Sequence, residues 1–248
     1  MLKKFLPERL ARLRVPPFLV AFLCGILPVP VYSSLPDQLL YKPLYGLPIL
    51  FLALFHRQLI HARNGKEAAL LGFSHGLGLF LGGVSWVYVS LADFAAMPVP
   101  VAALLTFCFC CYLALYPLLA ASIFHVLRRF SPQDLQPWLF AGCFTLAEIL
   151  RGTLLTGFPW LSLGYSQTPG TSPLAGLAPL LGVYGVSFLA YLSAAWIACL
   201  CFPFRRARLG PSAYTWLFLL QLGIFLTSLH WEWTKPSGEP VSVALLQG

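Results

Sequence analysis

Long apolar segments separated by short polar connections dominate the hydropathy pattern of this chain. Most of these segments approach the roughly 20 residues that a helix needs to cross the hydrocarbon core of a bilayer. We therefore predict a bundle of about seven transmembrane helices, of which the second and fifth are the shortest. The predicted spans cover residues 15–32, 43–55, 68–91, 99–127, 137–150, 180–202 and 213–231.

The composition agrees with this pattern. The chain is 58% hydrophobic and only 10% charged, and its mean hydropathy is +0.78. A soluble domain carries about 25% charged residues. The short alternating segments of a membrane β-barrel are absent from the sequence. We therefore expect an all-α integral membrane protein, because helices satisfy their own backbone hydrogen bonds within lipid.

The positions of the basic residues predict how the bundle is inserted. Thirteen of the 16 Lys and Arg residues lie in the N-terminal segment and in the second-to-third, fourth-to-fifth and sixth-to-seventh connections. The opposite side holds only Lys42, Arg151 and Lys235. By the positive-inside rule the N-terminus is cytoplasmic and the C-terminus lies on the other side of the membrane. The net charge of +8 therefore reflects insertion, and no nucleic-acid partner is expected.

The first apolar segment has a second interpretation. Basic residues ahead of an apolar run also begin a signal peptide, and cleavage near Ser33-Ser34 would fit one. Pro28 and Pro30 disturb that pattern, and a retained first helix agrees better with the alternation of charged connections.

The end of the chain has a different character. A turn at residues 235–240, rich in Pro and Gly, precedes a run at 241–248 that begins with β-branched residues and is too short to span a bilayer. This pattern predicts a strand at Val241–Leu246. A lone strand cannot satisfy its backbone groups. We therefore expect it to open a second domain, on the non-cytoplasmic side, whose remainder is missing from this sequence.

The segment between the fifth and sixth predicted spans, residues 147–167, is too apolar for an ordinary loop and too broken by Gly and Pro for a helix. Such a segment suits a re-entrant or interfacial element. Glu148 and Arg151 stand three residues apart, so on a helix they share a face and are expected to be able to pair. Ionisable residues at the edge of a span are functional candidates, and a structural ion pair explains them equally well.

Aromatic and polar residues follow in the same segment. Trp160 and Tyr165 each fit the interfacial aromatic belt of a membrane protein. They also fit a cradle for a lipid or a peptide, together with Phe158, Pro159, Ser166 and Gln167. Both interpretations stay open at this point.

Other features are assigned to packing. The third span carries Gly72, Gly76, Gly78, Gly82 and Gly83, and small residues at helical spacing allow helices to approach closely. His75, in the same span, is expected to be a hydrogen-bonded core residue. The seven cysteines fall inside predicted spans without metal-ligand spacing, so no metal site is expected. No nucleotide-binding or hydrolase motif is present, and no cofactor is predicted.

Several motifs resemble the bacterial apolipoprotein N-acyltransferases, and their order and spacing agree over essentially the whole chain. The phrase TGFPWL followed by GYSQ is the most specific of them. The matching segments are GFSHGLGLF at 72–80, WVYVS at 86–90, EILRG at 148–152, TGFPWL at 156–161, GYSQ at 164–167, GLAP at 176–179 and VALLQG at 243–248.

The resemblance implies an inner-membrane enzyme that passes an acyl chain from a phospholipid to the N-terminal diacylglyceryl-cysteine of an apolipoprotein. It implies a thioester on a catalytic Cys, with a Glu as general base and a Lys at the oxyanion. In the family these three residues lie in a nitrilase-like αββα domain. We therefore expect residues 1–234 to be the membrane domain and 235–248 to be a linker and the first strand of that nitrilase-like domain.

No catalytic residue is carried over, since the family's triad falls beyond residue 248. The membrane half supplies candidate substrate-binding residues by their match to the motifs. These are Trp160, Trp231, Glu148, Arg151, Tyr165, Ser166 and Gln167. The resemblance implies an acyltransferase part that is inactive alone and needs a nitrilase-like half, encoded with it or separately. The alternative is a non-enzymatic lipid-binding scaffold or remnant; a transporter is disfavoured, because the spans hold few polar residues.

Overall fold

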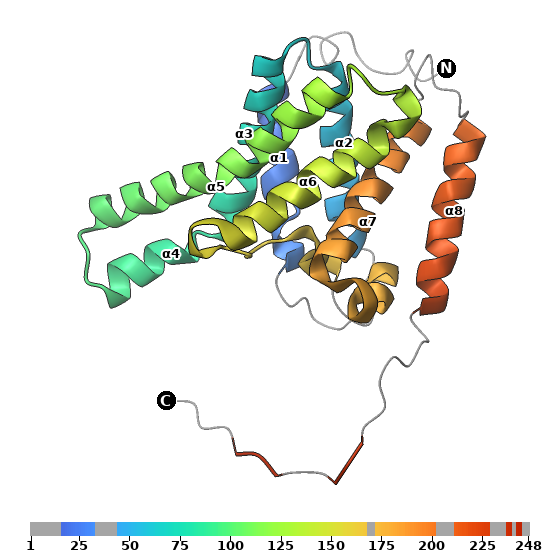
Figure 1. Cartoon of the computed structure of the whole chain (residues 1–248). Coiled ribbons are helices and arrows are strands. Elements are labelled where there is room, and N and C mark those ends of the chain that lie inside the picture. The colour runs from blue at the N-terminus through green and yellow to red at the C-terminus, as the bar shows by residue number, and fades with distance from the viewer. Residues whose placement is uncertain are drawn as a thin grey trace, which may run out of the picture.

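The computed structural model describes residues 16–32, 44–167, 172–201, 211–228, 237–239 and 242–244. All regular structure in these residues is helical (Figure 1). The main helices are α1 (Pro17–Ile26), α2 (Leu47–His61), α3 (Gly65–Gly83), α4 (Trp86–Val89), α5 (Val99–Leu127), α6 (Gln136–Thr153), α7 (Ala178–Cys201) and α8 (Pro211–Ser228). Short 3₁₀ segments are η3 (Val29–Tyr32), η6 (Gln133–Leu135), η7 (Leu154–Thr156), η8 (Leu163–Gln167) and η9 (Pro173–Leu177), and η5 (Ser90–Phe94) is a π-helical turn.

The protein has the helices of a membrane protein. Three stretches are long and apolar enough to cross a bilayer, namely 99–127, 133–156 and 174–201, and the bent pair α3–α4 makes a fourth if it counts as one span. Each of the seven predicted segments contains a helix. The count of seven crossings stays a prediction, because α1, α2 and α8 fall short in length or composition.

Two predicted boundaries differ from the structure. The third span, expected over 68–91, is interrupted after Gly83, and α4 continues at an angle of 49° to α3. Adjacent glycines at 82 and 83 weaken the helix at this point, because glycine has a low helix propensity. The second helix runs on to His61 instead of ending near Phe55. The polar residues there end the apolar pattern but not the hydrogen bonding of the helix.

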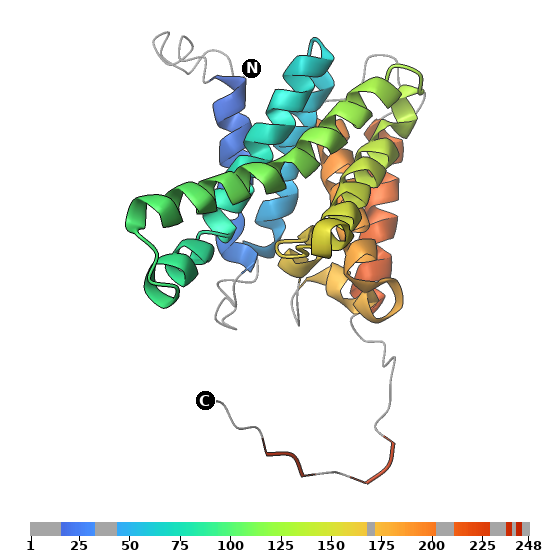
Figure 2. The ribbon, with the colours of Figure 1, turned by 60° about the vertical axis from the view of Figure 1, so that its left-hand side comes forward.

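The helices form one bundle, from which α4 and the first turns of α5 project on one side while α8 lies along α7 on the other (Figures 1 and 2). Helix α3 lies between α1 and α5 and uses its glycines against both. A Cβ atom at Gly78 would lie 2.2 Å from the Phe22 carbonyl oxygen of α1, and one at Gly72 would lie 2.5 Å from the Pro117 carbonyl oxygen of α5. The predicted packing role of these glycines is confirmed.

Arg128, just after α5, joins two of the connections that were predicted to lie on the same side. Its guanidinium donates to the carbonyl of Ile60 and, at 2.9 Å, to that of Ala62. The end of α5 therefore sits against the connection between α2 and α3. The predicted strand at Val241–Leu246 lies mostly outside the described residues, and residues 242–244 belong to no helix or strand.

Candidate functional site

The segment after α6 folds back on the end of that helix. Leu155, Thr156, Gly157 and Leu161 all have positive φ, which non-glycine residues seldom adopt. Gly157, at φ +76°, is required for a second reason, because a Cβ atom there would lie 2.1 Å from the Gly152 carbonyl oxygen. We call residues 157–167 the return loop. The predicted break between the fifth and sixth spans agrees with this path.

Arg151 fastens the return loop to α6. Its Nη1 donates to the carbonyls of Phe158, at 2.5 Å, and Trp160, and its Nη2 donates to Ser162 Oγ at 3.3 Å. The guanidinium carbon also lies 5.2 Å from the ring centroid of Phe80 in α3, in the geometry of a cation–π contact. The side chain is buried. The Arg151 guanidinium therefore supplies hydrogen bonds to loop carbonyls that lie outside any helix.

Glu148, one turn earlier on α6, holds the next part of the return loop. Its Oε1 accepts from the Leu163 N–H and from the Tyr191 hydroxyl of α7, both at 2.9 Å. The carboxyl group is buried. No ion pair joins Glu148 and Arg151 among the described residues, so the direct pairing expected from their spacing is not formed. Helical spacing puts them on one face, but the loop backbone takes up their hydrogen bonds.

Ser166 and Gln167 are also buried within the protein. The Ser166 hydroxyl donates to the Leu163 carbonyl at 2.7 Å. The Gln167 side chain donates to the Tyr45 carbonyl at 3.1 Å and accepts from the Ser172 hydroxyl at 2.8 Å. Gln167 therefore ties the end of the return loop to the segments before α2 and η9, and Ser166 bonds within the loop. They do not face an open space.

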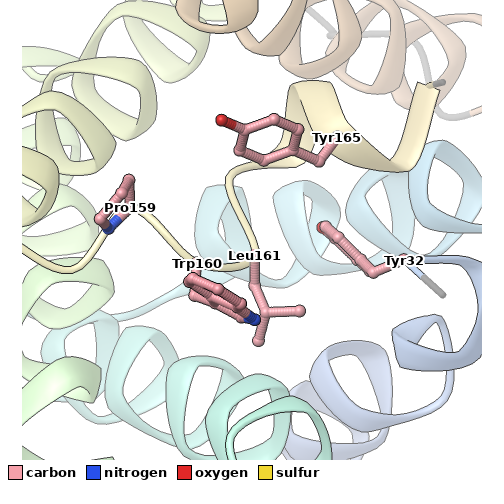
Figure 3. Close-up of a pocket in the computed structure, with 5 residues that line it drawn as sticks. All are labelled: Tyr32, Pro159, Trp160, Leu161 and Tyr165. Atoms are coloured by element: carbon pink, nitrogen blue, oxygen red, sulfur yellow. The ribbon is translucent and has the colours of Figure 1, made fainter. Parts of the chain in front are cut away.

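Trp160 and Tyr165 have the opposite orientation. They are 54% and 47% exposed, and both line an open pocket of about 370 Å³. Figure 3 shows their rings around one opening with Tyr32, Pro159 and Leu161. We call this space the return-loop pocket. Its walls are mostly aromatic and aliphatic.

Aromatic contacts extend the pocket wall toward α4 and α5. The Trp160 ring centroid lies 5.7 Å from that of Trp86 in α4 and 6.0 Å from that of Phe158. Phe158 in turn meets Phe109 of α5 edge-on at 5.1 Å. Trp160 thus connects the return loop to the projecting part of the bundle.

The predicted site residues divide into two groups. Trp160 and Tyr165 face the pocket, while the other four described candidates are buried and hold the return loop in place. Trp231 lies outside the described residues. Sequence reasoning missed Tyr32, Tyr191 and Ser162, because isolated hydroxyl residues in apolar or irregular stretches carry no pattern. The GFPWLSLGYS phrase contained Ser162, and its density of hydroxyl and aromatic groups was the available signal.

Comparison with known proteins settles the family. The family model described as "Apolipoprotein N-acyltransferase N-terminal domain" matches residues 38–196. The chain belongs to the apolipoprotein N-acyltransferase family. It is 48% identical over 207 residues to the apolipoprotein N-acyltransferase of Nitrosomonas europaea, an alignment that covers 83% of this chain and 40% of that protein. The namesakes from Chromobacterium violaceum and Ralstonia nicotianae are 39% and 38% identical, over 84% and 82% of this chain and 39% and 38% of their own lengths.

The alignments cover less than half of each relative. The chain spans about 40% of the length of the N-acyltransferases it resembles. The family model covers helices from α2 to most of α7, together with the whole return loop. The polar supports and the pocket residues of the return loop therefore lie within the matched N-terminal domain, whereas Tyr32 precedes it.

Proposed function

We propose that this chain is the membrane portion of an apolipoprotein N-acyltransferase, which moves an acyl chain from a phospholipid to the N-terminal diacylglyceryl-cysteine of a lipoprotein. In this proposal residues 1–234 are the membrane domain, and 235–248 are the linker and first strand of a nitrilase-like domain. The protein sits in the bacterial inner membrane with its N-terminus in the cytoplasm. Family membership and the asymmetry of basic residues support these assignments.

The return-loop pocket is the observation that carries the proposal. Its volume of about 370 Å³ falls within the usual range of small-molecule sites, roughly 300–1,000 Å³. The apolar walls suit an acyl chain, and the hydroxyl of Tyr165 can meet the polar ester at its head. We infer that the pocket receives the ester end of one phospholipid acyl chain.

The membrane part binds and orients the lipid in this proposal. Trp160 and Tyr165 contact it, and Arg151 and Glu148 keep the return loop in place from below. The nucleophilic Cys, with its Glu base and Lys, is assigned by the family resemblance to a nitrilase-like domain, in the same polypeptide or in a separate one. The chain's own residues then act through positioning, which lowers the entropic cost of bringing the lipid ester to the nucleophile.

Lipid photocrosslinking tests the binding part. The chain is placed in nanodiscs with a phosphatidylethanolamine that carries a diazirine next to the ester of one acyl chain, and the labelled peptides are identified by mass spectrometry. We expect labelling of residues 157–167 that falls in Trp160→Ala. The matched control Trp216→Ala removes an indole that is 72% exposed on α8, away from the pocket. Equal labelling of the return loop in the two variants would refute the assignment.

Acyl transfer tests the whole proposal. The chain is expressed with a nitrilase-like domain of the family, and a diacylglyceryl lipoprotein is the acceptor. N-acylation is expected when both parts are present and is expected to be lost when the nitrilase-like domain is omitted. If the two parts bind lipid and each other yet transfer no acyl chain, the scaffold interpretation replaces the enzyme.

A further inference from the structure

A second, much smaller cavity lies behind the return loop, and Leu161 lies between it and the return-loop pocket. Its volume is about 20 Å³, and it is bordered by α3, α5, α6 and α7. A cavity needs about 10–15 Å³ to hold one water molecule. This one therefore has room for a single water. Its lining includes the polar side chains of His75, Tyr116, Glu148, Arg151 and Tyr191.

Two of these side chains present buried polar atoms without a partner in the described structure. They are His75 Nδ1 and Glu148 Oε2, on side chains that are only 5% and 6% exposed. Leaving a buried polar atom unbonded costs about 1–3 kcal/mol, and more for a charged group. Two such atoms on the wall of the same small cavity point to a ligand that bonds to both.

The hydrogen-bonding roles of the two atoms can be assigned. His75 bonds to the backbone of Ala21 in α1. Since Nδ1 is the ring nitrogen without a partner, Nε2 makes that bond as a donor, and Nδ1 of the neutral ring is an acceptor. Glu148 uses Oε1 for Leu163 and Tyr191, and Ser187 of α7 also lies beside the carboxyl group, so Oε2 is left as a second acceptor. A ligand that bonds to both atoms therefore donates two protons, and the cavity volume of about 20 Å³ limits it to one heavy atom.

We propose that this cavity binds one water molecule that bridges His75 Nδ1 and Glu148 Oε2. The water donates one proton to each acceptor. The hydroxyls of Tyr112 and Tyr116 lie 2.7 Å apart. When Tyr112 donates the hydrogen bond between them, the Tyr116 proton is left to be donated to the water oxygen. The site gives the water the two to four polar partners that buried waters have in proteins. It links α3 to the carboxylate that holds Leu163 of the return loop.

An experimental structure of the chain in nanodiscs, at a resolution that shows ordered solvent, tests the site directly. We expect one isolated density peak within hydrogen-bonding distance of His75 Nδ1 and Glu148 Oε2. An empty cavity, or a direct hydrogen bond between the two side chains, would overturn the proposal. The measurement involves no acyl transfer, so its outcome is independent of the proposed enzymatic function.

A double-mutant cycle tests the same bridge in solution. His75→Leu and Glu148→Leu each remove one end, so the lowering of the unfolding temperature in the double variant should be smaller than the sum of the two single shifts. The matched control pairs His75→Leu with Thr145→Val, because Thr145 is buried on α6 but does not line the cavity. Those two shifts should add. Additive shifts for the His75 and Glu148 pair would contradict the bridge.

Discussion

Arg151 and Phe158 exchange two hydrogen bonds. The Phe158 N–H donates to the Arg151 carbonyl at 2.8 Å, and the Arg151 Nη1 donates to the Phe158 carbonyl at 2.5 Å. The same guanidinium reaches the carbonyl of Trp160 two residues later. The position of the exposed indole in the return-loop pocket therefore depends on a buried cation at the end of α6. Substitutions of Arg151 therefore test the support of the loop, whereas substitutions of Trp160 test the pocket wall.

Replacement of Arg151 by lysine should loosen the return loop although the charge is kept. An ammonium group cannot reproduce the planar fork that reaches Phe158, Trp160 and Ser162 together. We expect the free energy of unfolding to fall by about 2–3 kcal/mol. Amide hydrogen exchange of residues 157–163, measured by mass spectrometry in detergent, should rise. Arg129→Lys, an exposed residue after α5, is the control and should change neither quantity.

A methyl group at Gly157 should disrupt the turn into the return loop. The backbone has φ +76° there, and the added Cβ would lie 2.1 Å from the Gly152 carbonyl oxygen. We expect Gly157→Ala to lower stability by at least about 1–2 kcal/mol. Gly142→Ala, in the middle of α6 with no atom near the new Cβ, should be neutral or stabilising. A thermal unfolding series compares them, and equal midpoints would contradict the close contact.

The helices could be predicted from the sequence because each depends on a local pattern. Apolar stretches located the seven helical segments, and the glycines of α3 correctly indicated close packing against other helices. The break after Gly83 was missed. Two adjacent glycines are compatible with either a continuous or a bent helix, and the contacts around them decide between the two. The side chain of Leu161, whose Cδ1 would lie 2.4 Å from a Cβ at Gly83, supplies such a contact.

The arrangement of the site depends on distant contacts, and the sequence could not supply these. Glu148 bonds to Leu163, 15 residues away, and to Tyr191, 43 residues away in an apolar helix. No local pattern marks that tyrosine. Tyr165 and Ser166 are neighbours in the motif, yet one faces the pocket and the other is buried. The motif identified the right segment, and only the folded loop separates pocket-lining residues from supporting ones.

A polar contact should hold α8 to the bundle. The Gln221 side chain of α8 donates to Ser193 Oγ at 2.7 Å and to the Leu189 carbonyl at 3.2 Å, both in α7. Hydrogen bonds between membrane helices contribute about 0.6–1.7 kcal/mol. Gln221→Leu should lower the free energy of unfolding in SDS by about 0.6–1.7 kcal/mol. Thr227→Val is the control, because within the described residues the Thr227 hydroxyl bonds to carbonyls of its own helix alone. A larger effect in the control would refute this role of Gln221.

Truncation of Trp160 should separate binding from stability. The indole is 54% exposed, so Trp160→Ala should cost less than about 1 kcal/mol of folding free energy. It forms a wall of the return-loop pocket, and removal of an aromatic anchor typically costs about 2 kcal/mol of binding, roughly 30-fold in affinity. Competition between the photoreactive phospholipid and an unlabelled one measures this loss. Trp160→Phe should retain most of the affinity through its contact with Trp86, whereas Arg151→Lys should lower affinity and stability together. Loss of stability without loss of labelling in Trp160→Ala would mean that the indole supports the loop and does not bind lipid.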